Sequence, residues 1–91
     1  MKKILITEFM DQSAIDLLNK KFEIIYNDQI WEKSDLIEKN IENVDVVIVR
    51  NKTQLNSNIL QNAKKLKLIG RLGVGLDNID TNFCEKNNIK I

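Results

Sequence analysis

The 91-residue sequence contains no histidine, no proline, one cysteine and only three glycines. The single cysteine, Cys84, cannot form a disulfide within the chain, and the lack of histidine excludes the usual metal sites built from cysteine and histidine. We therefore expect no metal site. No proline, low-complexity segment or internal repeat marks a linker, so residues 1–91 are expected to form a single small domain.

Neither sign of charge is in excess, since 14 basic residues face 13 acidic ones. Such a balance lacks the positive surface that attracts nucleic acids and anionic membranes, and we expect neither as a partner. The apolar run near the start is too short for a signal peptide or a membrane span, which favours a cytoplasmic protein.

Predicted strands alternate with predicted helices along the chain. The expected strands cover 2–7, 22–26, 44–49, 67–72 and 89–91, the last being cut off by the chain end. The expected helices cover 11–22, 34–41, 56–66 and 81–87, with starts at Asp11 or Ser13, Ser34 or Asp35, Asn56 or Ser57, and Asp80. This order predicts an α/β fold: a flavodoxin-like, doubly wound parallel sheet of about five strands, ordered 2-1-3-4-5, with helices on both faces.

Ligands of such sheets bind outside the carboxyl ends of the strands, between the first and the third strand. The pattern places Thr7 and Glu8 on one side of that point. Arg50 and Asn51 lie on the other side, and Arg71 ends the fourth strand. Because lysine supplies 12 of the 14 basic residues, the two arginines stand out. A planar guanidinium holds a carboxylate or phosphate in a bidentate way that lysine cannot, so both arginines are candidate anion ligands.

All three glycines lie within residues 70–75, in the stretch GRLGVG. A dinucleotide fingerprint requires G-x-G-x-x-G after the first strand, whereas this loop follows the fourth strand and Asn78 replaces the third glycine. Glycines at 73 and 75 instead leave backbone amides open, so a small anion can bind to main-chain N–H groups. A plain strand-to-helix turn that needs positive φ is the alternative.

The segment LKLIGRLGVGLDNIDTNFCEKNNIKI, preceded by VVIVRNKTQLNSNIL, closely resembles the amino-terminal part of the D-isomer-specific 2-hydroxyacid dehydrogenases. Within that family it is most similar to the D-3-phosphoglycerate dehydrogenase branch, which acts in serine biosynthesis. The resemblance implies that residues 1–91 are the amino-terminal part of a flavodoxin-like substrate-binding domain. In the family a nucleotide-binding domain follows, and a carboxy-terminal return completes the substrate domain.

The resemblance also implies substrate-binding roles for Arg50, Asn51, Arg71, Val74 and Gly75. Val74 and Gly75 would present backbone N–H groups to the substrate carboxylate, and Val74 would also lie near the nicotinamide end of NAD. Arg50, with Asn51 beside it, would contact the carboxylate or a distal phosphate, while Arg71 would add positive charge. Asn51 departs from the serine common at this position, which leaves the substrate open.

The family's catalytic histidine, its glutamate and arginine partners and its true G-x-G-x-x-G all lie beyond the point that corresponds to Ile91. We therefore expect no catalytic residue and no activity in these 91 residues alone, whether they are the front piece of a longer protein or a stand-alone remnant. The implied enzyme oxidises a 2-hydroxyl by hydride transfer to NAD, takes a small 2-hydroxy or 2-keto acid and forms a homo-oligomer. The alternatives are a glyoxylate/hydroxypyruvate reductase, a D-lactate dehydrogenase, and a non-catalytic flavodoxin-like module that binds an anion or a protein partner.

Further expectations concern single side chains. Helical spacing places Leu17 on one apolar helix face with Ala14 and Leu18, and Leu36 on an inward face with Ile37 and Ile41. Glu8 is expected to be a solvated acid in preference to a pocket wall, Asn78 a turn-former, and Cys84 a buried and inert thiol.

Overall fold

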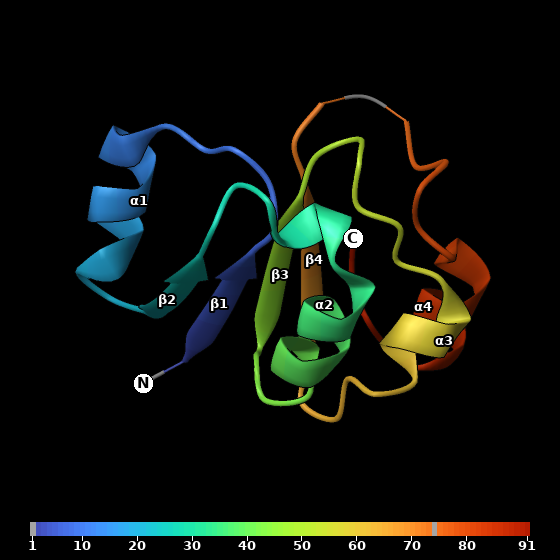
Figure 1. The fold of residues 1–91 in the computed structure, drawn as a ribbon. Helices are drawn as coiled ribbons and strands as arrows, with labels where there is room; N and C mark the ends of the chain where they lie inside the picture. Colours follow the sequence, from blue (N-terminus) through green and yellow to red (C-terminus); the bar gives the residue numbers. More distant parts are fainter. Residues whose placement is uncertain (1, 74) are drawn as a thin grey trace.

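Four parallel strands form a single sheet in the computed structural model, which describes residues 2–73 and 75–91. Within these residues the strands are β1 (Lys3–Ile6), β2 (Glu23–Tyr26), β3 (Val46–Val49) and β4 (Leu68–Arg71). The helices are α1 (Gln12–Asn19), α2 (Ser34–Ile41), α3 (Ser57–Leu60) and α4 (Thr81–Lys86), with a 3-10 helix, η1, at Ile30–Glu32. Figure 1 shows α1 beside β2, and α2, α3 and α4 grouped around β3 and β4.

The strand order is β2-β1-β3-β4, and each neighbouring pair is parallel. Leu5 of β1 lies opposite Ile25 of β2 and Val47 of β3, and Val47 in turn lies opposite Ile69 of β4. The flavodoxin-like α/β fold predicted from the sequence is confirmed, together with the first four places in its strand order.

The predicted fifth strand is present as a single parallel bridge between Leu68 and Lys90. Ile69 N donates to Lys90 O at 2.7 Å, and Lys90 N donates to Lys67 O at 2.9 Å. The bridge lies beside β4, the place that the order 2-1-3-4-5 assigns to the fifth strand.

The two faces of the sheet are covered by different helices. On one face, Leu5, Val47 and Ile69 are at most 1% exposed. They share a core cluster with side chains of α2, α3 and α4, namely Ile37, Ile41, Ile59, Leu60 and Cys84. On the other face, Ile4 and Ile6 pack with Ile15 of α1. Helices thus cover both faces, as expected for a doubly wound sheet.

The face that carries α1 is only partly covered over β3 and β4. Val46 and Ile48 are half-buried there, and Leu68 is 42% exposed. Gly70 lies opposite Ile48 on the same side, and a Cβ atom at this position would stand 3.4 Å from Ile48 Cγ1. An apolar, incompletely covered patch therefore remains on this side in the described part of the chain.

Two of the predicted helix faces each contain one residue that the structure leaves exposed. Leu17 is 65% exposed, because Ile15 is the residue of α1 that packs against β1. Leu36 is also exposed, whereas Ile37 and Ile41 bury the inner face of α2 as expected.

The helix starts are partly as predicted. Asn56 Oδ1 accepts from Ile59 N at 3.1 Å, and Asp80 Oδ1 accepts from Phe83 N at 3.0 Å, so both side chains cap their helices. Asp11 stands at the N-cap of α1 but its side chain makes no capping bond. The N-cap of α2 is Lys33, so the prediction of Ser34 or Asp35 is wrong.

Helix α3 ends at Leu60, earlier than the predicted boundary at residue 66. The amides of Asn62 and Ala63 bond to the carbonyls three residues before them, which tightens the chain into a turn. The Asn62 side-chain amide donates to Asn58 O at 3.0 Å and satisfies a carbonyl at the end of the helix.

Cys84 lies on the inner side of α4 and is 1% exposed. Burial raises the pKa of its thiol, and the charge of Asp80 raises it further. The thiol therefore stays protonated at neutral pH, which agrees with the expected inert side chain.

Candidate functional site

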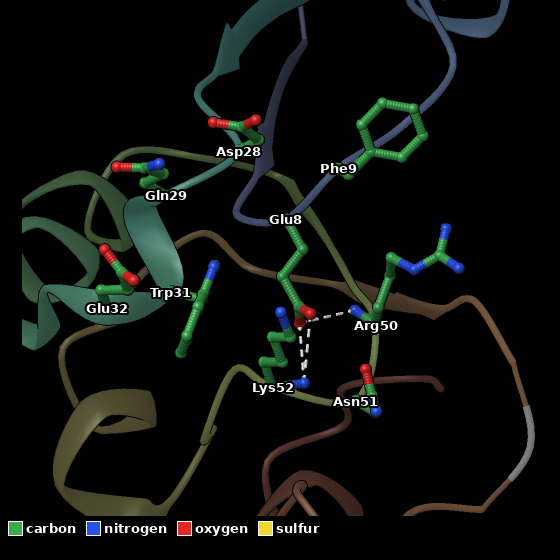
Figure 2. Close-up of a pocket in the computed structure, with 9 residues that line it drawn as sticks. All are labelled: Glu8, Phe9, Asp28, Gln29, Trp31, Glu32, Arg50, Asn51 and Lys52. Carbon is green, nitrogen blue, oxygen red and sulfur yellow. Dashed lines mark hydrogen bonds between the residues drawn. The ribbon is translucent and has the colours of Figure 1, made fainter.

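The segments that follow β1, β2 and β3 line a pocket of about 370 Å³ at the carboxyl end of the sheet (Figure 2). Its lining residues are Glu8, Phe9, Asp28, Gln29, Trp31, Glu32, Arg50, Asn51 and Lys52. This is the switch point between the first and the third strand where the sequence predicted a ligand edge.

Loop 50–53 starts where β3 ends at Val49. Arg50 and Asn51 are both exposed, and Figure 2 shows the Arg50 side chain extending away from the Glu8 carboxylate, on the side of Phe9. Lys52 Nζ lies 4.8 Å from the centre of the Trp31 ring, a cation–π contact on the pocket wall. The pocket thus combines two cations, Arg50 and Lys52, with three acidic residues, Glu8, Asp28 and Glu32.

Glu8 is buried, at 3% exposure, and its carboxylate collects the N–H groups of loop 50–53. Oε2 accepts from Arg50 N at 2.8 Å and from Thr53 N at 2.9 Å, while Oε1 accepts from Lys52 N at 3.1 Å. The Thr53 hydroxyl donates to Oε2 at 2.7 Å. The prediction of a solvated acid at this position is therefore wrong.

The pKa of Glu8 follows from two opposed effects. Burial alone would raise it, but the hydrogen bonds from the Thr53 hydroxyl and from the amides of Thr53, Arg50 and Lys52 lower it below its ordinary value. Glu8 is consequently ionised at neutral pH and serves as an acceptor, which excludes it as a proton donor there.

Two buried hydroxyls extend the Glu8 network. Thr7 Oγ1 lies 2.7 Å from Thr53 Oγ1, and both residues have no exposed surface. Because Thr53 gives its single hydroxyl proton to Glu8, Thr7 must be the donor in the bond between the two threonines. The end of β1 is thus linked to loop 50–53 through side chains as well as amides.

Asn78 holds the same loop from the other side. Its side chain is 7% exposed, and its amide nitrogen donates to Arg50 O and to Thr53 O, both at 2.8 Å. Its backbone carbonyl accepts from Leu55 N at 2.8 Å. Asn78, which was expected to be a turn-former, therefore also connects its own segment to loop 50–53 by hydrogen bonds.

The glycine loop, residues 72–77, follows β4 and lies next to loop 50–53. Gly73 has φ 115° and Gly75 has φ 84°, values that favour glycine and that the alternative, a strand-to-helix turn, also requires. A Cβ atom at Gly75 would have no atom within 4 Å, so its surroundings are open. Val74, assigned to the substrate carboxylate and to NAD from the sequence, lies outside the described residues.

A second pocket, of about 290 Å³, lies between the two loops. Its lining residues are Asn51, Gln54, Arg71, Gly75, Asp77 and Asn78. The Arg71 guanidinium donates from Nη1 to the carbonyl of Leu72. The structure thus brings Asn51, Arg71 and Gly75 together, and Asn51 also lines the first pocket together with Arg50.

Among the pocket residues that the sequence did not assign to the site, Glu8 and Asn78 are the two that bind loop 50–53. One feature of the sequence could have indicated that Glu8 is buried. It follows an apolar strand at the ligand edge, and the neighbouring strand residues are themselves buried. For Asn78, the corresponding feature is its position in the glycine-rich stretch, where a dinucleotide fingerprint would have its third glycine. Neither feature identifies the bonding partners, which lie 25 to 45 residues away in the sequence.

The arrangement suits the binding of a small anion. Arg50 lines the first pocket, while Arg71 and Gly75, whose surroundings are open, line the second. Guanidinium groups and backbone amides at glycines both bind carboxylates or phosphates. Within residues 2–73 and 75–91, no group of three or more potential ligands from histidine, cysteine, aspartate and glutamate could hold a metal ion. In the same residues, every helix is too short or too polar to cross a membrane.

Residues 4–91 match the family described as D-isomer specific 2-hydroxyacid dehydrogenase, catalytic domain. The hydroxypyruvate reductase of Thermotoga maritima is 36% identical over 89 residues, which are 98% of this chain and 29% of that protein. The D-3-phosphoglycerate dehydrogenase of Methanocaldococcus jannaschii is 38% identical over 89 residues, again 98% of this chain but 17% of the relative. The chain thus spans less than a third of the length of either relative.

A solved structure with the same fold is that of the NAD⁺-bound 3-phosphoglycerate dehydrogenase from Entamoeba histolytica. It superimposes with a TM-score of 0.81 at 26% sequence identity, covering 97% of this chain and 31% of the other.

Proposed function

The chain belongs to the D-isomer-specific 2-hydroxyacid dehydrogenases, a family of oxidoreductases, and we propose that it is the amino-terminal part of the substrate-binding domain of such an enzyme. The enzyme oxidises the 2-hydroxyl of a small acid, or reduces the corresponding 2-keto acid. The observation that carries the proposal is the meeting of Arg50 and Asn51 with Arg71 and Gly75 around two adjacent pockets that share Asn51.

Within this proposal the glycine loop holds the substrate carboxylate. Positive φ at Gly73 and Gly75 and the open space at Gly75 leave room for an anion at the backbone. The amides of Val74 and Gly75 are assigned to the carboxylate, and Arg71 and Asn51 border the same pocket. Arg50 then contacts the distal end of the substrate from the first pocket.

We propose D-3-phosphoglycerate as the substrate, which would place the enzyme in serine biosynthesis. A distal phosphate suits Arg50, because a guanidinium binds phosphate in a bidentate way. The 38% identity to a D-3-phosphoglycerate dehydrogenase supports this choice. The 36% identity to a hydroxypyruvate reductase supports the second candidate, a glyoxylate or hydroxypyruvate reductase.

NAD is the proposed hydride acceptor, bound mainly by a nucleotide-binding domain outside these 91 residues. The chain's own glycine loop does not fit a dinucleotide, because Asn78 replaces the third glycine and its side chain is engaged with Arg50 O and Thr53 O. A multi-segment substrate domain is supported by the apolar patch left on β3 and β4, where Leu68 is 42% exposed. We propose a cytoplasmic homo-oligomer.

The test compares two lengths of the protein, these 91 residues and the product of the complete gene. Each is purified and assayed for NADH formation with D-3-phosphoglycerate, D-glycerate, D-lactate and glycolate. We expect turnover with D-3-phosphoglycerate for the gene product and none for the 91 residues. Turnover by the 91 residues would contradict the absence of catalytic residues here. Anion binding by the gene product without turnover on any acid would favour the non-catalytic module.

A further inference from the structure

Loop 50–53 is held almost entirely through its backbone. Three of its N–H groups, those of Arg50, Lys52 and Thr53, donate to the Glu8 carboxylate. Two of its carbonyls, those of Arg50 and Thr53, accept from the Asn78 side chain. The buried Glu8 carboxylate thus accepts from N–H groups of the loop, and the buried Asn78 amide donates to two of its carbonyls.

The two holding residues belong to different parts of the chain. Glu8 follows β1, whereas Asn78 follows the glycine loop. Both are buried, at 3% and 7% exposure, and both lie at the carboxyl edge of the sheet where the two pockets open. Loop 50–53 is therefore fixed relative to β1 and to the glycine loop at the same time.

The side chains of Arg50 and Asn51 take no part in this arrangement. Both are exposed and line the pockets, and Figure 2 shows the Arg50 guanidinium turned away from Glu8. We propose that Glu8 and Asn78 are positioning residues, which fix the backbone of loop 50–53 so that Arg50 and Asn51 face the substrate anion. This inference rests on the proposed function, since it assigns the ligand of Arg50 and Asn51 to the substrate.

Because Glu8 is charged, the inference can be tested by whether Glu8→Gln strengthens or weakens anion binding. Glu8 is ionised and lines the first pocket, so its charge alone repels an anion bound there. If Glu8 acted through charge only, Glu8→Gln would strengthen anion binding. If Glu8 positions the loop, the same substitution weakens binding, because glutamine replaces one acceptor oxygen by an NH₂ group that cannot accept from the loop amides.

The experiment measures the dissociation constant of D-3-phosphoglycerate by calorimetry in the product of the complete gene, with hydroxypyruvate as a second probe. We expect Glu8→Gln to weaken binding about tenfold or more, the loss typical of charge-assisted hydrogen bonds. The matched control is Glu85→Gln, which removes a carboxylate charge from an exposed residue of α4. Glu85 lines neither pocket, so this control should bind the anion as tightly as the unmodified protein.

A second variant, Asn78→Ala, removes the two bonds to the loop carbonyls without changing charge. We expect it to weaken binding about fivefold or more. Its control is Asn87→Ala, which removes an exposed asparagine that donates to Phe83 O at the end of α4. If Glu8→Gln fails to fold, the binding measured for Asn78→Ala decides whether loop 50–53 must be positioned for the anion to bind.

The outcomes separate this inference from the proposed function. Absence of binding in the unmodified protein overturns the proposed function and the inference with it. Binding that is unchanged or stronger in Glu8→Gln and unchanged in Asn78→Ala overturns the positioning role alone. Failure of both variants to fold also overturns it, because the two residues would then hold the domain as a whole.

Discussion

The two loops that border the second pocket keep their shapes by opposite means. Loop 50–53 contains no glycine and is bound on both sides by buried polar side chains, from Glu8 and Asn78. In the described residues of the glycine loop, the shape instead depends on backbone conformations at Gly73 and Gly75 that other residues rarely adopt.

This difference shows where each loop is vulnerable. A loop shaped by glycine is sensitive to substitution within itself, because a Cβ atom penalises positive φ. A loop held through its amides and carbonyls tolerates changes of its own side chains, but it is sensitive to changes at the distant residues that bind it.

Substitution within the glycine loop is expected to have the largest effect on substrate binding. Gly75→Val places a β-branched residue at φ 84° and fills the open space assigned to the carboxylate. We expect the Michaelis constant for the 2-hydroxy acid to rise roughly a hundredfold, with less effect on NAD affinity. Val74→Ile is the control, since a backbone contact should tolerate a change of side chain. A collapse of NAD affinity with unchanged substrate binding would show that the loop is a nucleotide site after all.

The distant support of loop 50–53 should appear in protein stability. Glu8→Gln leaves buried N–H groups with fewer acceptors, so we expect the free energy of unfolding to fall by about 2–3 kcal/mol. The exposed Glu32→Gln should change it by less than about 0.5 kcal/mol. Urea denaturation of the unmodified chain and the two variants measures both values. Equal stability of all three would mean that the Glu8 bonds contribute nothing net.

The two arginines are expected to differ in importance. Arg50→Lys loses a bidentate contact to an anion, which costs about 1.5–3 kcal/mol, or roughly tenfold to a hundredfold in the specificity constant. Arg71→Lys should cost less, because part of the Arg71 guanidinium already donates to the carbonyl of Leu72. Steady-state kinetics with D-3-phosphoglycerate compares them. Unchanged kinetics for Arg50→Lys would make Arg50 a structural residue.

The smallest expected effect is a change in the acid dependence of stability. The pKa of Glu8 is lower in the folded chain than its ordinary value, so its stabilisation is fully present above that ordinary value. The stabilisation is lost as pH falls through the lowered pKa. The unfolding free energy should therefore decrease less on acidification in Glu8→Gln than in the unmodified chain or Glu32→Gln. If the unfolding free energies of Glu8→Gln and the unmodified chain depended on pH in the same way, the folded chain would not stabilise the ionised Glu8 carboxylate.

Features that depend on local sequence were predictable. The alternation of strands and helices predicted the parallel sheet and its order, and the capping roles of Asn56 and Asp80 followed from their side chains. Positive φ at Gly73 and Gly75 likewise follows from the one residue type that adopts it at no cost.

Features that depend on distant partners were not predictable. Burial of Glu8 is favourable only because amides 42 to 45 residues later in the sequence converge on it. The exposed Leu17 reflects a similar limit. Ile15 and Leu17 are both apolar and lie about 200° apart on the helix, so periodicity alone could not decide which of them faces the sheet.

The backbone attachment of loop 50–53 has a consequence for how such proteins change over evolutionary time. The side-chain bonds from Asn78 and the amide bonds to Glu8 use main-chain atoms of the loop, which are present whatever side chains other than proline stand at 50, 51 and 52. A mutation at these three positions therefore alters the chemistry offered to a ligand while the support beneath it stays in place. Thr53 is the exception, because its hydroxyl is also bound by Glu8. New ligand preferences can accordingly arise by exchange at 50–52, one residue at a time, without refolding the loop.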